Sequence, residues 1–178
     1  MKIASLLDEI VAKTDKNIVF ICMSKGNDYG QDYQAGEKLK DLMVNKNPFY
    51  LLEPIDDIKL VKGIIGKAIF SMGISYHLHV FSLSQGNPTL ILYTGDYYKI
   101  KSEGLISFYN PPNRVVNISE TENEIILNYI LEIENNLSSI KTRNFEVNKK
   151  ILEDNDWTIK SLKSILENKS LQISEETN

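Results

Sequence analysis

Hydrophobic positions along the chain form two alternating patterns, short continuous runs and longer segments with helical spacing. The continuous apolar runs, which are rich in β-branched residues, are 17–23, 49–52, 68–72, 88–93 and 115–118. The segments with helical spacing that precede or separate them are 2–13, 31–45, 56–66 and 76–85, and Asp56 or Asp57 is expected to cap the third of these. Strands buried on both faces of a parallel sheet give such continuous runs. The alternation predicts an α/β domain over residues 1–120, with a Rossmann-like five-stranded parallel sheet and flanking helices.

The pattern changes after residue 118. Ser119 and Glu122 have the spacing of a capping box, which predicts a helix from about 122 to 138. Further helical spacing extends the helical region over 121–168, and the polar segment 169–178 is typical of a frayed tail. These helices carry more apolar surface than one small sheet can cover. We expect an exposed apolar patch there, or one buried against a dimer partner or another domain.

Composition narrows the functional classes. Hydrophobic residues make up 42% and charged residues 25% of the 178 residues, a globular composition. The net charge of −4 argues against nucleic-acid binding. No run approaches the length that spans a bilayer, so we expect a cytoplasmic protein with at most peripheral membrane contact. Cys22 is the only cysteine, and with two histidines it does not suggest a metal site.

The most informative stretch is Ala68–Gly104, where motif residues follow one another in a fixed order. They are Ser75, His77-Leu78-His79, Gly86-Asn87-Pro88, Tyr97-Tyr98, Lys101 and Gly104. Their order and spacing resemble the C-terminal half of the polysaccharide pyruvyl transferase family, over residues 17–118. In that family a tyrosine-rich loop with a lysine and a glycine follows the second strand of the motif, which implies a loop at Tyr97–Gly104 here. The resemblance implies one half of a glycosyltransferase-B-type fold, in which two Rossmann-like halves enclose the active site. It further implies that phosphoenolpyruvate donates a pyruvyl group to a sugar hydroxyl of a bacterial surface polysaccharide.

The resemblance also assigns candidate site residues. His79 matches the family's histidine and is expected to transfer a proton or contact phosphate, and His77 stands where the family has arginine. The expected donor-binding or anion-binding residues are Ser75, Tyr76, Lys101, Ser24 and Asp28. Tyr97 and Tyr98 are weaker candidates for a sugar-stacking wall. Simpler structural roles compete with these: Ser75 suits a helix N-cap, Asp28 a turn, and His79 a polar position on a helix.

Several alternatives stay open. Because His77 cannot form the arginine fork that grips a carboxylate, the donor can instead be a nucleotide sugar. A third hypothesis is a non-catalytic binding or assembly module. The chain is short for the two-half architecture, so we expect a natural fragment, an excised piece or a split gene product. Its partner would be the other half or a second copy. Phosphoenolpyruvate is a co-substrate, no cofactor is predicted, and a divalent metal requirement is undetermined.

Overall fold

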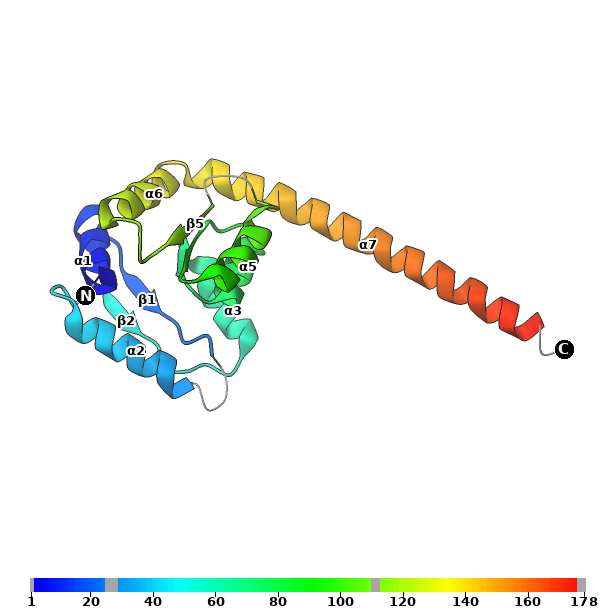
Figure 1. The fold of residues 1–178 in the computed structure, drawn as a ribbon, viewed down its shortest axis with the longest axis horizontal. Coiled ribbons are helices and arrows are strands. Elements are labelled where there is room, and N and C mark those ends of the chain that lie inside the picture. Colours follow the sequence, from blue (N-terminus) through cyan, green and yellow to red (C-terminus); the bar gives the residue numbers. More distant parts are fainter. Residues whose placement is uncertain (1, 25–28, 110–112, 176–178) are drawn as a thin grey trace.

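Helices and strands alternate in the computed structural model, which describes residues 2–24, 29–109 and 113–175 (Figure 1). The strands are β1 (Ile18–Phe20), β2 (Phe49–Leu51), β3 (Ser71–Gly73), β4 (Thr89–Tyr93) and β5 (Arg114–Asn117). The helices are α1 (Lys2–Thr14), α2 (Tyr29–Leu42), α3 (Ile58–Lys67), α4 (Tyr76–Leu83), α5 (Asp96–Ile106), α6 (Asn123–Asn135) and α7 (Leu137–Glu175). The α/β class predicted from the sequence is therefore confirmed.

The strands form two parallel ladders. β1 pairs with β2, while β4 lies between β3 and β5 in a second ladder. The predicted single five-stranded sheet is wrong, because the described residues show no pairing between β1 and β3. Just after β1, the carboxylate of Asp32 accepts hydrogen bonds from the backbone N–H groups of Met23 and Ser24, at 2.8 and 2.9 Å. A side chain thus satisfies donors that a neighbouring strand would otherwise use.

Helices α1 and α6 cover the main hydrophobic core. Leu6 and Ile10 from α1 and Ile126 and Ile130 from α6 are almost fully buried. They belong to one cluster that also contains Phe49, Leu90, Leu92, Val116 and Ile118 from both ladders and their ends. Because side chains alternate across a strand, Thr89 points from β4 to the opposite side, where its hydroxyl contacts α4. The ladders are therefore sandwiched between two layers of helices.

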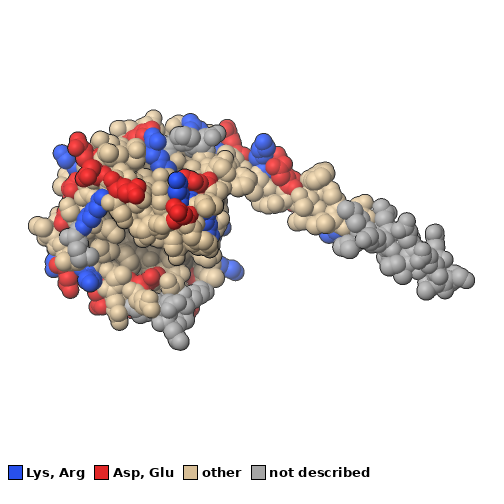
Figure 2. Space-filling model, in the orientation of Figure 1, with Lys and Arg blue, Asp and Glu red and all other residues tan. Residues whose placement is uncertain are grey.

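The first turns of α7 are fastened to the body by amide side chains. Asn144 Nδ2 donates to the carbonyls of Gly86 and Asn87, at 3.2 and 3.4 Å. Asn148 Nδ2 donates to the carbonyl of Leu83 at 2.8 Å, and its Oδ1 accepts from the Tyr109 hydroxyl at 2.6 Å. Beyond this point α7 projects away from the body (Figures 1 and 2). The helix runs to Glu175, through most of the segment expected to be a frayed tail.

Two local predictions are wrong and one is confirmed. The segment expected to be a tyrosine-rich loop is helix α5, which begins after Gly95 with φ 78°. The expected capping box does not form, because Glu122 itself is the N-cap of α6 and its side chain makes no capping hydrogen bond. Asp57, one of two aspartates expected to cap α3, does so by accepting from the backbone N–H groups of Lys59 and Leu60.

Candidate functional site

An aromatic and basic cluster lies at the start of α4 and α5. The Nζ of Lys101 is 4.4 Å from the ring centroid of Tyr76 and 6.0 Å from that of Tyr97. Tyr98 meets Tyr97 edge to face, with ring centroids 5.2 Å apart. The ring faces attract the ammonium group. Tyr76 of α4, a predicted anion-binding residue, is thereby brought together with three motif residues of α5.

This cluster lies at the edge of the β3–β4–β5 ladder where the strands end. Helix α4 follows β3 directly and α5 follows β4, so both helices begin at the carboxyl ends of parallel strands. Open α/β sheets bind ligands at this edge.

The N-terminus of α4 is electrostatically suited to an anion. Ser75 is the N-cap, as the simpler interpretation predicts, but its side chain makes no capping hydrogen bond, and the first turn has no acidic residue. The first N–H groups of the helix are therefore not neutralised locally, and the helix dipole adds positive potential. In α5, by contrast, Asp96 occupies the first turn. An anion at this edge is expected to favour the α4 side, where Lys101 adds its charge.

The two histidines differ completely in environment. His77 is exposed, with its ring centroid 6.1 Å from Tyr76 and 6.5 Å from Phe81. His79 has no exposed surface, and both of its ring nitrogens are engaged by the protein. Nε2 lies 2.9 Å from the carbonyl oxygen of Gly73, and Nδ1 lies 2.5 Å from the hydroxyl oxygen of Thr89.

Hydrogen-bonding chemistry fixes the tautomer of His79. The Gly73 carbonyl can only accept, so Nε2 carries the proton and Nδ1 accepts from the Thr89 hydroxyl. The Thr89 oxygen in turn lies 2.8 Å from the Ser71 hydroxyl oxygen, which can donate to it. Burial lowers the pKa of His79 to about 4, with the Gly73 carbonyl opposing that shift. His79 is therefore neutral at pH 7 and joins α4 to β3 and β4. The predicted proton-transfer role finds no support in this geometry.

The remaining predicted residues lie in the loop after β1. Ser24 is partly buried, and its backbone is held by Asp32 at the start of α2. No hydrogen bond or ring contact among the described residues links it to the cluster around Lys101. Asp28 lies outside the described residues. The structure therefore brings Tyr76 of α4 into contact with candidate residues of α5, whereas Ser24 makes no contact with this cluster.

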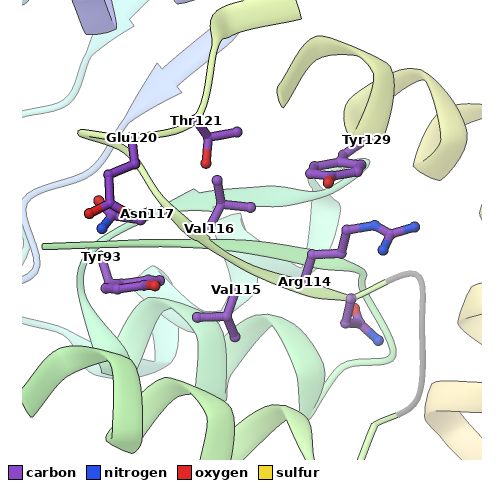
Figure 3. Close-up of a pocket in the computed structure, with 9 residues that line it drawn as sticks. Tyr93, Arg114, Val115, Val116, Asn117, Glu120, Thr121 and Tyr129 are labelled. Carbon is purple, nitrogen blue, oxygen red and sulfur yellow. The ribbon is translucent and has the colours of Figure 1, made fainter. Parts of the chain in front are cut away.

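A separate hollow of about 460 Å³ lies along β5 (Figure 3). Arg114 on its wall donates to Glu132 at 2.8 Å and lies over the Tyr129 ring at 4.4 Å. The cation is thus already paired, and Glu120 adds negative charge to the lining. Tyr93, a third tyrosine that the sequence offers for a sugar-stacking wall beside Tyr97 and Tyr98, lines this hollow, whereas the other described candidate residues do not. Because Arg114 is already paired and Glu120 is negative, the charges of the hollow do not favour an anionic donor.

The described residues contain neither a metal-binding cluster nor a membrane-spanning helix. In residues 2–24, 29–109 and 113–175, no three His, Cys, Asp or Glu side chains gather where they could hold a metal ion. In the same part of the chain, no helix combines the length and apolar character needed to cross a bilayer. Burial raises the pKa of the Cys22 thiol, with Asp32 and Glu53 adding to the shift, so the thiolate is disfavoured.

Comparison with known proteins does not assign the chain to a family. No protein-family model matches the chain, and no curated protein matches it either. The chain is thus assigned to the α/β class with parallel strand pairs.

The sequence interpretation missed the residues that fasten these elements together. Thr89 N–H donates to Asn113 Oδ1 at 3.0 Å, and Asn113 Nδ2 donates to Asn144 Oδ1 at 3.1 Å. This buried chain connects β4 and the start of β5 to α7. Buried asparagines inside apolar segments are a usable signal, since an amide is buried only where its hydrogen bonds are met.

Proposed function

We propose that the chain is the donor-binding domain of an enzyme resembling polysaccharide pyruvyl transferases. Phosphoenolpyruvate binds between the first turn of α4 and Lys101, for transfer of its pyruvyl group to a sugar hydroxyl. The observation that carries this proposal is the 4.4 Å approach of Lys101 Nζ to the Tyr76 ring. This contact joins candidate residues of two helices at one edge of the ladder. They lie beside the N-terminus of α4, whose first turn has no acidic residue.

The chemistry of the donor fits these groups. Phosphoenolpyruvate carries a carboxylate and a phosphate, which the ammonium of Lys101 and the N–H groups of α4 can neutralise. Ser75 supplies a hydroxyl that the helix does not use as a cap. The exposed rings of Tyr97 and Tyr98 offer apolar faces to a sugar.

The exposed His77 is a better candidate than the buried His79 to deliver a proton. Pyruvyl transfer requires a proton at the enol carbon while phosphate leaves. His77 lies on the first turn of α4 and is exposed, whereas His79 has no surface and no free ring nitrogen. The second wall of the cleft, with the acceptor site, comes from another domain or a second copy. The chain alone is therefore expected to bind donor without turning it over.

Titration calorimetry with phosphoenolpyruvate tests the proposal. We expect weak binding, in the high micromolar to millimolar range, that declines with added salt. Lys101→Gln should weaken it about fivefold, since an ammonium–anion contact is lost. Lys99→Gln is the matched control, because Lys99 lies on the same helix but pairs with Glu103 at 4.0 Å. Binding that is equally sensitive to both substitutions, or to neither, would remove the site from this cluster.

A nucleotide sugar is the second candidate donor. Tyr97 is 69% exposed, so its ring is available to stack on a base, and His77 replaces the family's arginine. Parallel titrations with uridine diphosphate sugars decide between the donors. Tighter binding of the nucleotide that weakens in Tyr97→Ala would select the glycosyl-transfer alternative. If neither donor binds, the non-catalytic module remains and the enzymatic proposal fails.

A further inference from the structure

The projecting part of α7 carries a row of exposed apolar side chains. Leu152, Ile159 and Leu162 are 65%, 51% and 54% exposed. Leu152 and Ile159 are seven residues apart, and Leu162 follows three residues later. Alternating steps of seven, or of three and four, place such residues on one side of a helix. This row, Leu152, Asn155, Ile159 and Leu162, is termed the α7 stripe.

A helix with this stripe needs a partner. The stability of a helix in water comes mainly from packing an apolar face, and a segment without such packing is marginal. After Asn148, the last residue hydrogen-bonded to the body among those described, α7 continues to Glu175. Figure 1 shows this part of α7 leaving the body. The body therefore does not supply the missing contact.

We propose that the α7 stripe pairs with the α7 stripe of a second copy of the chain, as an antiparallel two-helix coiled coil. The spacing supplies the seam, because residues at steps of seven and three are those that interlock in coiled coils. Asn155 lies within the seam. A polar residue at such a position restricts the register and the number of helices.

The flanking charges select a second copy in antiparallel orientation. Asp156 and Lys163 lie seven residues apart on the same flank of the stripe. When Ile159 of one chain packs beside Leu162 of the other, antiparallel pairing brings Asp156 close to Lys163 of the second copy. The twofold symmetry repeats this opposite-charge pair. In a parallel pair this flank would instead face the opposite flank of the other helix, so Asp156 would lie near Ile151 and Lys163 near Thr158, and the opposite charges would not meet. The inference is independent of the proposed donor site.

Sedimentation analysis of the full chain tests this surface. We expect a species of twice the 20.3 kDa chain mass that forms in the micromolar range. Ile159→Asp should raise the dissociation constant at least about tenfold, because it places a charge in the seam. Trp157→Asp is the matched control. Trp157 is 71% exposed but lies two positions from Ile159, on the far side of the helix, so dimerisation should be unchanged.

A charge exchange tests the orientation. Asp156→Lys should weaken the dimer several-fold, since two lysines then meet. The double variant Asp156→Lys with Lys163→Asp should recover the original affinity, because the opposite charges meet again with their places exchanged. Circular dichroism verifies that each variant keeps the folded body. A chain that stays monomeric at high concentration, a dimer insensitive to Ile159→Asp, or a double variant without recovery would each overturn the proposal.

Discussion

The buried His79 makes the stability of the fold depend on pH in a predictable way. In the folded chain its pKa is lowered to about 4 by burial, whereas an unfolded histidine titrates near pH 6.5. Between these values the unfolded chain binds the extra proton, so the free energy of unfolding rises with pH. The contribution is fully present above about pH 6.5 and is lost as pH falls toward 4. From pH 7.5 to 4.5 the loss amounts to about 2 to 3 kcal/mol.

The substitution His79→Gln isolates this contribution. The glutamine amide nitrogen can still donate to the Gly73 carbonyl but does not titrate in this range. Thr89 loses its acceptor on the ring, although the carbonyl of Ser71 lies 3.3 Å from its hydroxyl. At pH 7.5 we therefore expect a modest loss of stability, about 1 kcal/mol.

Urea unfolding followed by circular dichroism measures the pH dependence. The wild-type chain should lose about 2 to 3 kcal/mol more than His79→Gln between pH 7.5 and 4.5. His77→Gln is the control, since it removes the other histidine from an exposed site, and it should retain the wild-type pH dependence. Carboxylates titrate in all three proteins and cancel in the comparison. Equal pH dependence in the wild type and His79→Gln would refute a buried neutral histidine.

Three further predictions concern the end of α4, the attachment of α7 and the cap of α3. Gly86→Ala should lower the unfolding free energy by about 2 kcal/mol in urea titrations, because Gly86 has φ 77° and an added Cβ would lie 2.6 Å from the Phe145 ring. Asn144→Leu should lower it by about 3 kcal/mol and release α7 to hydrogen exchange, since Asn113 loses a buried partner. Asp57→Ala should lower the melting temperature through a loss of about 1 kcal/mol at the cap of α3, and unchanged melting would contradict that capping role.

The sequence predicts elements better than it predicts their pairing. Apolar runs located all five strands, because continuous β-branched segments suit a buried parallel strand. They did not predict that β1 and β3 lie in separate ladders, since hydrogen bonds from Met23 and Ser24 to Asp32 depend on the folded chain. Helix α5 was missed because its tyrosines and isoleucine favour strands. Its helical signals, Asp96 in the first turn and the Lys99–Glu103 pair, were present but weak.

His77 and His79 show why a sequence motif alone does not identify functional residues. His77 and His79 are two positions apart, which on a helix places them about 200° apart. Once α4 packs against the ladder, only one of them can face solvent. Local sequence does not decide which, because Leu78, Val80 and Phe81 make the helix apolar around most of its circumference. The decision comes from Thr89, which offers a hydroxyl to the inward histidine. A motif match at His79 is therefore compatible with a structural role. The proposed ligand site depends instead on the contact between Tyr76 and Lys101.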